Sequence, residues 1–392
     1  MKEGWEYKKL GEVCDFQNGF AFKSNLFEDK GIGVVRISDI QNGEVSKEKM
    51  TYVNPQTFKE DLSSYTVRPN DILIAMSGGT TGKLGINKTN ETFFQNQRVG
   101  LFREHKDKLN HMFLYYFLHT KSEESLKIAA GAAQPNLSTA QIKQFQIPIP
   151  SLSEQQQIVE YLDAQFKRID ALKANAEQQL QAAKDLFQSS IDNFFKLSQS
   201  RILKDLVDII NGYAFKSEDF KKDAELKIIK ITNVGVGEFI EDDSRINIIH
   251  KNLDIAKVYE NDIVIALTRT IISSGLKVAI IPRSYNEALL NQRVACLREN
   301  KKSSIRYIYY YLSSNSAIKY VLSKVNTLMQ PNLSINDLKN MPVPYVNIEE
   351  QQNIVAQLDD LSAKVKQLQT NYEQTITHCN DLKQSLLKKV FE

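Results

Sequence analysis

The chain of 392 residues repeats itself once, and this repeat limits the folds that it can adopt. The offset between matching motifs stays between 191 and 196 residues, about half of the chain, so the repeat indicates a duplicated fold and not a solenoid. We therefore expect two halves of the same fold, related by approximate two-fold symmetry. The five motifs are Asn-Gly-Phe/Tyr-Ala-Phe-Lys-Ser at 18–24 and 211–217, Asn-Asp-Ile-Leu/Val-Ile-Ala at 70–75 and 261–266, Asn-Gln-Arg-Val at 96–99 and 291–294, Gln-Pro-Asn-Leu-Ser at 134–138 and 330–334, and Glu-Gln-Gln at 154–156 and 350–352.

Each half begins with a segment of mixed character, at 1–150 and 198–346. Short runs rich in β-branched residues, such as 71–74, are separated by turns that contain glycine and asparagine. A candidate helix rich in aromatic residues follows in each half, at 111–118 and 306–312. These patterns predict one globular α+β domain in each half.

Each half ends in a different kind of segment, at 151–197 and 347–392. Neither segment contains proline or glycine, and glutamine, lysine, alanine and leucine dominate both. Both segments predict a helix of about 60 Å, at about 1.5 Å per residue. Each begins with a capping side chain that is followed three residues later by a glutamate, Ser151 with Glu154 and Asn347 with Glu350.

Apolar and small residues recur in both long segments at alternating steps of four and three, the pattern of a coiled coil. We expect the two helices to pair with each other in an antiparallel coiled coil; a coiled coil between two copies of the chain is the alternative. The predicted seams are Ile158, Leu162, Gln165, Ile169, Leu172, Ala176, Gln179, Ala183, Leu186 and Ser190 in the first helix, and Ile354, Leu358, Leu361, Val365, Leu368, Tyr372, Thr375, Cys379, Leu382 and Leu386 in the second.

Composition points to an ordinary soluble protein of the cytoplasm. The net charge of +3 neither requires nor excludes a nucleic-acid partner, because the clustering of the basic residues decides this. Cys14, Cys296 and Cys379 lie far apart, so we expect neither a disulfide framework nor a zinc site, in agreement with a reducing compartment. The chain begins without an apolar signal core and has no stretch apolar enough to span a bilayer, so we expect no membrane partner.

The sequence contains no set of residues that matches a known catalytic motif in full. The run at 77–84 resembles a phosphate-binding loop, but Ser77 occupies the place of its leading glycine and Leu84 the place of its magnesium-binding Ser or Thr. The five histidines lack the spacing of metal ligands, and no dinucleotide-binding glycine motif follows a predicted strand. We therefore expect no catalytic residue, no metal site and no cofactor in this chain.

Two loops after equivalent strands, at 77–88 and 267–283, combine glycine, hydroxyl groups and cations. Such groups suit nucleic acid, because amides and hydroxyls donate to phosphates, Lys and Arg add charge, and an arginine can fork onto a guanine edge. The loops differ between the halves while their flanking strands match, as expected of reading surfaces on a shared scaffold; solvated hairpins without a ligand are the alternative. The candidate DNA-binding residues in these loops are Ser77, Thr80, Thr81, Lys83, Lys88, Thr268, Arg269, Thr270, Ser273 and Lys277.

Four further candidate DNA-binding residues lie in motifs that both halves share: Lys23, Arg98, Lys216 and Arg293. Their identity in the two halves indicates a contact to the DNA backbone or a structural role, and both interpretations stay open. The shared Asn-Leu-Ser motif leads into predicted helix caps, Ser138 with Gln141 and Ser334 with Asp337.

Taken together, these motifs make the whole chain resemble the specificity subunits of type I restriction–modification systems. The resemblance is carried by the repeated motifs above, by the Pro-x-Pro runs that lead into Glu-Gln-Gln-x-Ile-Val in each half, and by the ending at 382–391. As a set these motifs are highly specific, although none is so by itself.

The resemblance implies an α+β fold with two similar α/β target-recognition domains in a pseudo-two-fold arrangement, separated by two long antiparallel coiled-coil helices. On this basis we expect domains at 1–150 and 198–346, and spacer helices at 151–197 and 347–392. The family's function implies that the chain reads a bipartite, asymmetric site in double-stranded DNA, in defence against foreign DNA. Two methyltransferase subunits are expected to dock on it, and restriction/translocase subunits to join through them. S-adenosylmethionine, magnesium and ATP then belong to these partners.

Two other functions compete with this one. The chain is either a non-enzymatic adaptor or scaffold whose heads bind something other than DNA, or a DNA-modifying enzyme with motifs that are not recognised. Methyl transfer by the chain alone would indicate the enzyme, and heads without preference for any DNA would indicate the adaptor.

Overall fold

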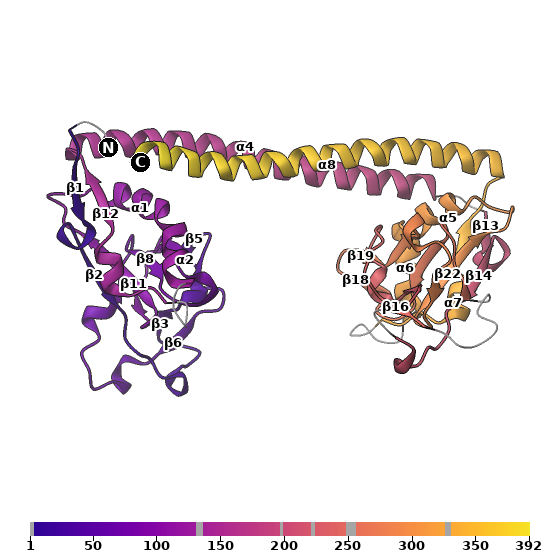
Figure 1. Ribbon diagram of the computed structural model, residues 1–392, viewed down its shortest axis with the longest axis horizontal. Coiled ribbons are helices and arrows are strands. Elements are labelled where there is room, and N and C mark those ends of the chain that lie inside the picture. The colour runs from indigo at the N-terminus through magenta and orange to yellow at the C-terminus, as the bar shows by residue number, and fades with distance from the viewer. Residues whose placement is uncertain (1–3, 131–135, 197–198, 221–223, 248–255, 326–330) are drawn as a thin grey trace. The chain divides into compact units, whose positions relative to one another are not determined.

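A computed structural model describes residues 4–130, 136–196, 199–220, 224–247, 256–325 and 331–392 (Figure 1). The chain divides into two compact units, unit 1 with residues 1–176 and 374–392 and unit 2 with residues 177–373. Each unit contains one globular head and parts of two long helices, α4 (Leu152–Phe194) and α8 (Ile348–Phe391).

Among its described residues, the head of unit 1 contains two sheets, a two-stranded ribbon and three short α-helices. The larger sheet has the order β2-β11-β8-β9-β5-β4, the smaller one β6-β3-β10-β7, and the ribbon pairs β1 with β12. The elements are β1 (Glu6–Lys9), β2 (Cys14–Asn18), β3 (Ile32–Val35), β4 (Ile40–Gln41), β5 (Gly43–Val45), β6 (Thr51–Val53), β7 (Thr66–Val67), β8 (Ile72–Ala75), β9 (Leu84–Ile86), β10 (Phe93–Gln95), β11 (Val99–Glu104), α1 (His111–Thr120), α2 (Ser122–Ala130), α3 (Thr139–Lys143) and β12 (Gln146–Ile149).

The head of unit 2 follows the same plan. Its larger sheet has the order β14-β22-β17-β20, its smaller one β16-β15-β21, and two ribbons pair β13 with β23 and β18 with β19. The elements are β13 (Ser200–Ile202), β14 (Val207–Asn211), β15 (Leu226–Ile229), β16 (Arg245–Ile246), β17 (Ile263–Ala266), β18 (Ile271–Ile272), β19 (Gly275–Leu276), β20 (Val278–Ile280), β21 (Leu289–Leu290), β22 (Val294–Glu299), α5 (Ile305–Leu312), α6 (Asn315–Lys324), α7 (Ile335–Lys339) and β23 (Pro342–Pro344).

The strand pairing confirms that the two heads share one fold. The order β2-β11-β8-β9 corresponds to β14-β22-β17-β20, and a parallel pair forms in each smaller sheet, β3 with β10 and β15 with β21. The register agrees as well, because Asn18 pairs with Gly100 and Asn211 with Ala295. The prediction of two similar heads of mixed helix and sheet is therefore correct.

The central strand of each head is buried on both faces. All four residues of β8 and all four of β17 are buried, which explains why these strands are continuously apolar instead of alternating. Ile72 and Ile74 pack in the cluster that contains α1, whereas Leu73 and Ala75 pack in the cluster of the smaller sheet. Because both faces of the strand pack in an apolar cluster, the end of the strand is held in place, and so is the start of the loop that follows it.

The helix caps of α4 and α8 form as predicted. The hydroxyl oxygen of Ser151 accepts the backbone N–H of Glu154 at 3.2 Å, and Oδ1 of Asn347 accepts that of Glu350 at 2.9 Å. Each cap satisfies one of the N–H groups that have no partner within the helix.

The two long helices pair antiparallel within each unit. In unit 1, Lys383 of α8 forms an ion pair with Asp170 of α4, and Lys173 donates to Asn380 at 3.2 Å. In unit 2, residues near the end of α4 share one apolar cluster with residues near the start of α8, including Ile191 and Leu358. The predicted intramolecular pairing is therefore confirmed for each unit.

The predicted seam register is right at every second position of α4, and in α8 it is right at Ile354, Leu358, Val365 and Cys379. Leu162, Ile169, Ala176 and Ala183 are buried as expected, but Leu172 and Leu186 are each 59% exposed, and Leu368 and Leu382 are 40% and 48% exposed. At the other seam positions of α4, the residue after the predicted one faces inward. Two of these residues are Phe166 and Phe187, whose rings turn towards the heads. Phe166 packs edge-on against Tyr116 at 5.3 Å between ring centroids, and Phe187 packs against Tyr310 at 6.4 Å.

Candidate nucleic-acid interface

Repeated motifs that are far apart in sequence meet where the central strand of each head ends. In unit 1, the N–H of Met76 donates to the carbonyl of Arg98 at 2.9 Å, and the carbonyl of Met76 accepts the N–H of Leu137 at 2.8 Å. In unit 2, Leu267 makes the same two bonds with Arg293 and Leu333, at 2.9 and 2.8 Å. The backbone thus brings the Asn-Gln-Arg and Pro-Asn-Leu-Ser motifs together in both heads.

The Asn-Gly-aromatic motif packs against the same place. A Cβ added at Gly19 would lie 2.1 Å from the carbonyl oxygen of Gln95, and one added at Gly212 would lie 2.0 Å from that of Asn291. No real Cβ makes such an approach, so only glycine permits this contact. The glycine of the motif is therefore structural in both heads.

The asparagine of each Asn-Gln-Arg motif holds a tight turn that presents the two residues after it. Oδ1 of Asn96 accepts the N–H of Arg98, and Oδ1 of Asn291 accepts that of Arg293, both at 3.4 Å. Arg98 and Arg293 are exposed. Among the described residues, neither guanidinium has a hydrogen bond or ion pair, so both are available for an anion.

In unit 1 these motifs surround a shallow cavity of about 560 Å³. One of its edges is closed by Thr139, whose hydroxyl donates to Oδ1 of Asn18 at 2.7 Å. Charge at the cavity is positive, since Arg98 is the one ionisable residue among the described residues that line it. The polar lining consists of Asn18, Gln97, Arg98, Asn136, Ser138 and Thr139.

Several cavity residues were not among the candidates from sequence. Asn18, Asn136 and Ser138 lie in repeated motifs, so repetition itself was the available signal. The serine also caps α3, because its Oγ accepts the N–H of Gln141 at 3.2 Å, and Ser334 caps α7 in the same way at 3.0 Å. Of the motif that contains these serines, residues 134, 135 and 330 lie outside the described residues.

The loops that follow the central strands β8 and β17 begin with the same backbone hydrogen bond in both heads, but their outer parts differ. The N–H of Ala75 bonds to the carbonyl of Lys83 at 2.9 Å, and the N–H of Ala266 bonds to that of Lys277 at 3.1 Å. Unit 2 inserts the hairpin β18–β19 between these points, whereas unit 1 has a short turn there. The scaffold is thus common to the heads, and the projecting parts are not.

Burial separates the candidate loop residues into two groups. Three face the interior and do not offer their side chains to a ligand: Ser77 is 7% exposed, Thr81 2% and Thr270 0%. The hydroxyl of Thr81 donates to the carbonyl of Gly78 at 2.7 Å, so it stabilises its own loop. The outward-facing group, fully or partly exposed, comprises Lys23, Thr80, Lys83, Lys88, Arg98, Lys216, Thr268, Arg269, Ser273, Lys277 and Arg293.

Some outward-facing cations already have partners in the protein. Lys88 forms an ion pair with Glu44 at 2.7 Å, and Lys216 with Glu218 at 3.5 Å. The ammonium of Lys277 donates to the carbonyl of Ile231 at 2.8 Å, and burial is the main reason why its pKa is lowered. Exposed ion pairs are weak and exchange readily, so they leave Lys88 and Lys216 accessible to phosphate.

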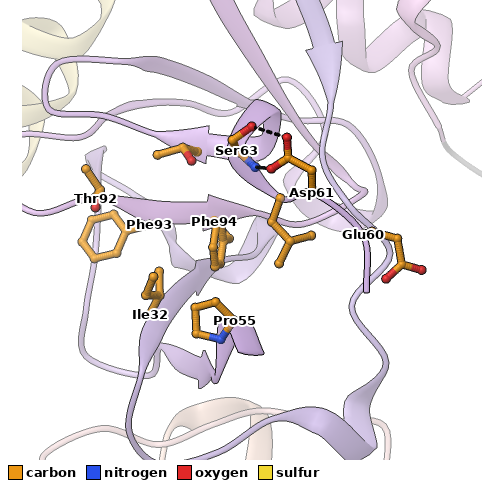
Figure 2. Close-up of a pocket in the computed structure, with 10 residues that line it drawn as sticks. Ile32, Pro55, Glu60, Asp61, Ser63, Thr92, Phe93 and Phe94 are labelled. Carbon is orange, nitrogen blue, oxygen red and sulfur yellow. Dashed lines mark hydrogen bonds between the residues drawn. The ribbon is translucent and has the colours of Figure 1, made fainter. Parts of the chain in front are cut away.

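A second hollow in unit 1, of about 350 Å³, has a different character (Figure 2). Figure 2 shows Phe93 and Phe94 in its apolar lining, with Glu60 and Asp61 on one side. The carboxylate of Asp61 accepts the N–H and the hydroxyl of Ser63 at 2.9 and 2.8 Å, and these bonds lower its pKa. An ionised, acidic rim repels phosphate, so this hollow does not belong to the candidate interface.

Titratable groups of the described residues form no metal centre, and two buried thiols are unreactive. Burial raises the pKa of the Cys14 thiol to about 12 and that of Cys296 well above its usual range, which keeps both thiols protonated at neutral pH. No three described His, Cys, Asp or Glu side chains lie close enough together to hold a metal ion. None of the described helices has both the length and the apolar composition needed to cross a membrane.

A family model described as the type I restriction modification DNA specificity domain matches residues 2–182 and 196–378 of this chain. The type I restriction enzyme EcoBI specificity subunit of Escherichia coli is 25% identical to this chain, and the match covers 100% of this chain and 86% of that protein. The EcoKI specificity subunit of E. coli strain K12 is 24% identical, with coverage of 100% and 89%.

Solved structures share the fold. A chain from a structure on the assembly and conformational transition of the type I R-M system matches with a TM-score of 0.77 at 18% identity, covering 99% of this chain and 97% of that chain. The HsdS subunit from Thermoanaerobacter tengcongensis matches with a TM-score of 0.56 at 19% identity, covering 100% and 97%.

Proposed function

The chain belongs to the family of type I restriction–modification DNA specificity domains, and on this basis we propose that it is the DNA-recognition subunit of a type I restriction–modification complex. The observation that carries the proposal is the pairing of one scaffold with two different sets of loops. A duplicated scaffold gives two recognition modules, and loops that differ give each module its own target sequence.

The site that this arrangement fits is bipartite and asymmetric double-stranded DNA. Each head binds one half-site, with domains at 1–150 and 198–346. If the two heads carried the same loops, they would bind two copies of one sequence. Because unit 2 has the β18–β19 hairpin where unit 1 has a short turn, the two half-sites differ.

Within each head, the shared residues and the divergent residues have different tasks. Arg98 and Arg293, which both heads present on the same turn, contact the sugar-phosphate backbone, whose charge does not depend on sequence. The divergent loops at 77–83 and 268–277 approach base edges, where sequence is read in the major groove. The interior hydroxyl of Thr81 supports its loop from inside, through its bond to the carbonyl of Gly78.

The long helices, predicted as spacers at 151–197 and 347–392, provide the docking surface for partner proteins. Four leucines are exposed on them at repeated positions, since Leu172 matches Leu368 and Leu186 matches Leu382 at the same offset of 196 residues. Unit 1 contains Leu172 and Leu382, and unit 2 contains Leu186 and Leu368. Exposed apolar residues that occur twice in equivalent settings suit a partner that binds twice, here two methyltransferase subunits.

The chain contributes recognition and leaves the chemistry to its partners. Adenine methylation with S-adenosylmethionine belongs to the methyltransferase subunits, and ATP-driven cleavage to restriction/translocase subunits that join through them, in the cytoplasm. Cofactors are accordingly not assigned to this chain. A scaffold protein that binds no DNA and a DNA-modifying enzyme are the competing functions.

Selection of bound sites from random double-stranded DNA tests the proposal. The full chain is co-purified with its partner methyltransferase subunit, and the bound DNA is sequenced. The proposal predicts two short, different motifs at a fixed separation; enrichment of no motif would support the scaffold function. A parallel incubation of the chain alone with radiolabelled S-adenosylmethionine and DNA is expected to transfer no methyl group, and transfer would establish an enzyme.

A further inference from the structure

One backbone position is left-handed in both heads but carries different residues. Gly78 in unit 1 has a φ of +72°, and Arg269 in unit 2 has a φ of +48°. The equivalence of the two positions follows from the pairing just before them, because Ser77 bridges Asn136 and Thr268 bridges Asn332. Glycine adopts this conformation freely, whereas the Cβ of an arginine is strained there.

The scaffold of unit 2 gives no reason for an arginine at this position. The backbone N–H of Arg269 donates to Oδ1 of Asn332 at 3.4 Å, a bond that any residue except proline can make. Its side chain is exposed, and its guanidinium has no hydrogen bond or ion pair to a described residue. Backbone strain that no internal contact requires is a sign of a functional side chain.

The surroundings of Arg269 suit an approach to DNA. The residue stands at the base of the β18–β19 hairpin, whose turn exposes the hydroxyls of Ser273 and Ser274. Lys277 lies close enough that the positive charge of Arg269 adds to the lowering of its pKa, which is mainly due to burial. The guanidinium is therefore part of a cationic, projecting surface.

We infer that Arg269 reads a guanine edge in the half-site bound by unit 2, an inference that rests on the proposed function. A guanidinium donates two parallel hydrogen bonds to O6 and N7 of guanine, and no other base edge offers this pair of acceptors in the major groove. Arg269 lies just after the end of β17 and is exposed to solvent, so its guanidinium is accessible to a base edge.

The comparison of the two heads favours a base over a phosphate as the partner of Arg269. Every nucleotide carries a phosphate, so a cation that contacts phosphate is needed in both heads, as Arg98 and Arg293 illustrate. A cation that reads a base is needed only where that base occurs. Gly78 replaces the arginine in unit 1, which is the expected difference for a residue that specifies one half-site only.

The test uses site selection from random double-stranded DNA with the complex of the full chain and its methyltransferase. Three chains are compared: the wild type, Arg269→Gly and Arg269→Lys. Arg269→Gly installs the residue that unit 1 uses on the same backbone, so the melting temperature is expected to stay within about 2 °C of the wild type. Arg269→Lys keeps the charge but removes the planar fork.

The wild type is expected to select guanine at one position of one half-site. In Arg269→Gly this preference falls by roughly 5- to 150-fold, while every other position and the second half-site keep theirs. Arg269→Lys loses most of the same preference, with an unchanged dependence of affinity on salt.

The outcomes separate this inference from the function on which it rests. A wild-type complex that selects no bipartite site would overturn both. A wild type that selects a bipartite site, together with an Arg269→Gly complex that selects the identical site, would overturn the inference alone. Equal weakening of all sequences by Arg269→Gly would also overturn it, because that result identifies a phosphate contact.

Discussion

The side chain of Gln155, fully buried at the start of α4, accepts a hydrogen bond from the backbone N–H of Asn110 at 2.7 Å. Its amide N–H₂ group donates to the carbonyls of Lys108 and Pro150, both at 2.9 Å. Gln351 occupies the equivalent place in unit 2, where its Oε1 accepts the N–H of Ser304 at 2.9 Å. A buried glutamine therefore joins each long helix to the head of its own unit.

Replacing Gln155 by leucine should weaken this junction. The change removes the partners of one buried carbonyl and of a carbonyl and an N–H that are partly buried, so the unfolding free energy of unit 1 should fall by about 3 kcal/mol. Urea unfolding, followed together with hydrogen exchange at Asn110, measures the loss. Gln157→Leu is the matched control, since Gln157 is exposed two residues further along the same helix. Equal stability of the two variants would contradict the role of the buried glutamine.

Glycine is required where the Asn-Gly-aromatic motif meets the backbone at the end of β10 in unit 1 and of β21 in unit 2. Gly19→Ala and Gly212→Ala place a Cβ about 2 Å from a backbone oxygen, so each should reduce stability by about 2 kcal/mol or more. Thermal unfolding checks this. Gly79→Ala has open space around the new Cβ and should change stability little. A small loss of stability in Gly19→Ala would contradict this requirement, because it would show that the backbone at Gln95 can shift to make room for the new Cβ.

Exposed leucines on the long helices should decide how many methyltransferase subunits bind. Leu172→Asp with Leu382→Asp alters unit 1 only, and Leu186→Asp with Leu368→Asp alters unit 2 only. Each double variant should lower the number of bound subunits from two to one, because a charge replaces apolar contact area at one docking site. Native mass spectrometry measures the stoichiometry.

Leu322→Asp is the control for this experiment, since Leu322 is 43% exposed on α6, outside the long helices. Its complex should keep both subunits. Retention of two subunits by both double variants would place the docking surface elsewhere.

The two shared arginines should contribute affinity without specificity. Arg98→Ala or Arg293→Ala removes one cation from the Asn-Gln-Arg turn of one head, so all DNA sequences should bind more weakly in the same proportion. The slope of log affinity against log salt concentration should become smaller by about one for each arginine. Fluorescence anisotropy at several salt concentrations measures both quantities. A change in the selected sequence would instead assign the arginine to base reading.

His119 should make unit 1 less stable in mild acid. Burial, with a smaller contribution from the charge of Lys383, lowers the pKa of His119 to about 4. The unfolded chain takes up this proton below about pH 6.5 and the folded chain only below about pH 4. The unfolding free energy should therefore fall by about 1–3 kcal/mol between these values, and should be unaffected by this group above pH 7.

Urea unfolding between pH 4 and 8 tests this expectation. On acidification, the unfolding free energy of His119→Gln should fall by about 1–3 kcal/mol less than that of the wild type. His378 is exposed, and His378→Gln should behave like the wild type. Identical pH profiles for the wild type and His119→Gln would show that His119 takes up its proton at the same pH in the folded and in the unfolded chain.

Local features of the fold were predictable because they depend on nearby residues or on the repeat. The caps at Ser151 and Asn347 follow from spacing alone. The common scaffold follows from the repeat, and its physical basis is visible at Met76 and Leu267, which make the same two backbone bonds in the two heads. Repetition is thus a reliable guide to the backbone.

Features that depend on distant contacts were not predictable. The residues that form the seam of α4 depend on Phe166 and Phe187, whose rings pack on the heads. The periodicity of the helix sequence does not reveal these contacts. Thr81 and Thr270 carry hydroxyls typical of a phosphate site, but their loops fold inward and bury them. The role of Gln155 depends on the carbonyl of Lys108 and the N–H of Asn110, which belong to a segment more than forty residues earlier.

The division of recognition between the two heads is tested most directly by altering one loop at a time. Two complexes are compared by site selection, one in which alanines replace the exposed residues of the loop at 77–83 and one in which they replace those at 268–277. The account predicts that each change degrades one half of the selected DNA motif, a different half in each complex, and leaves the other half intact. Degradation of both halves by a single loop change would contradict it.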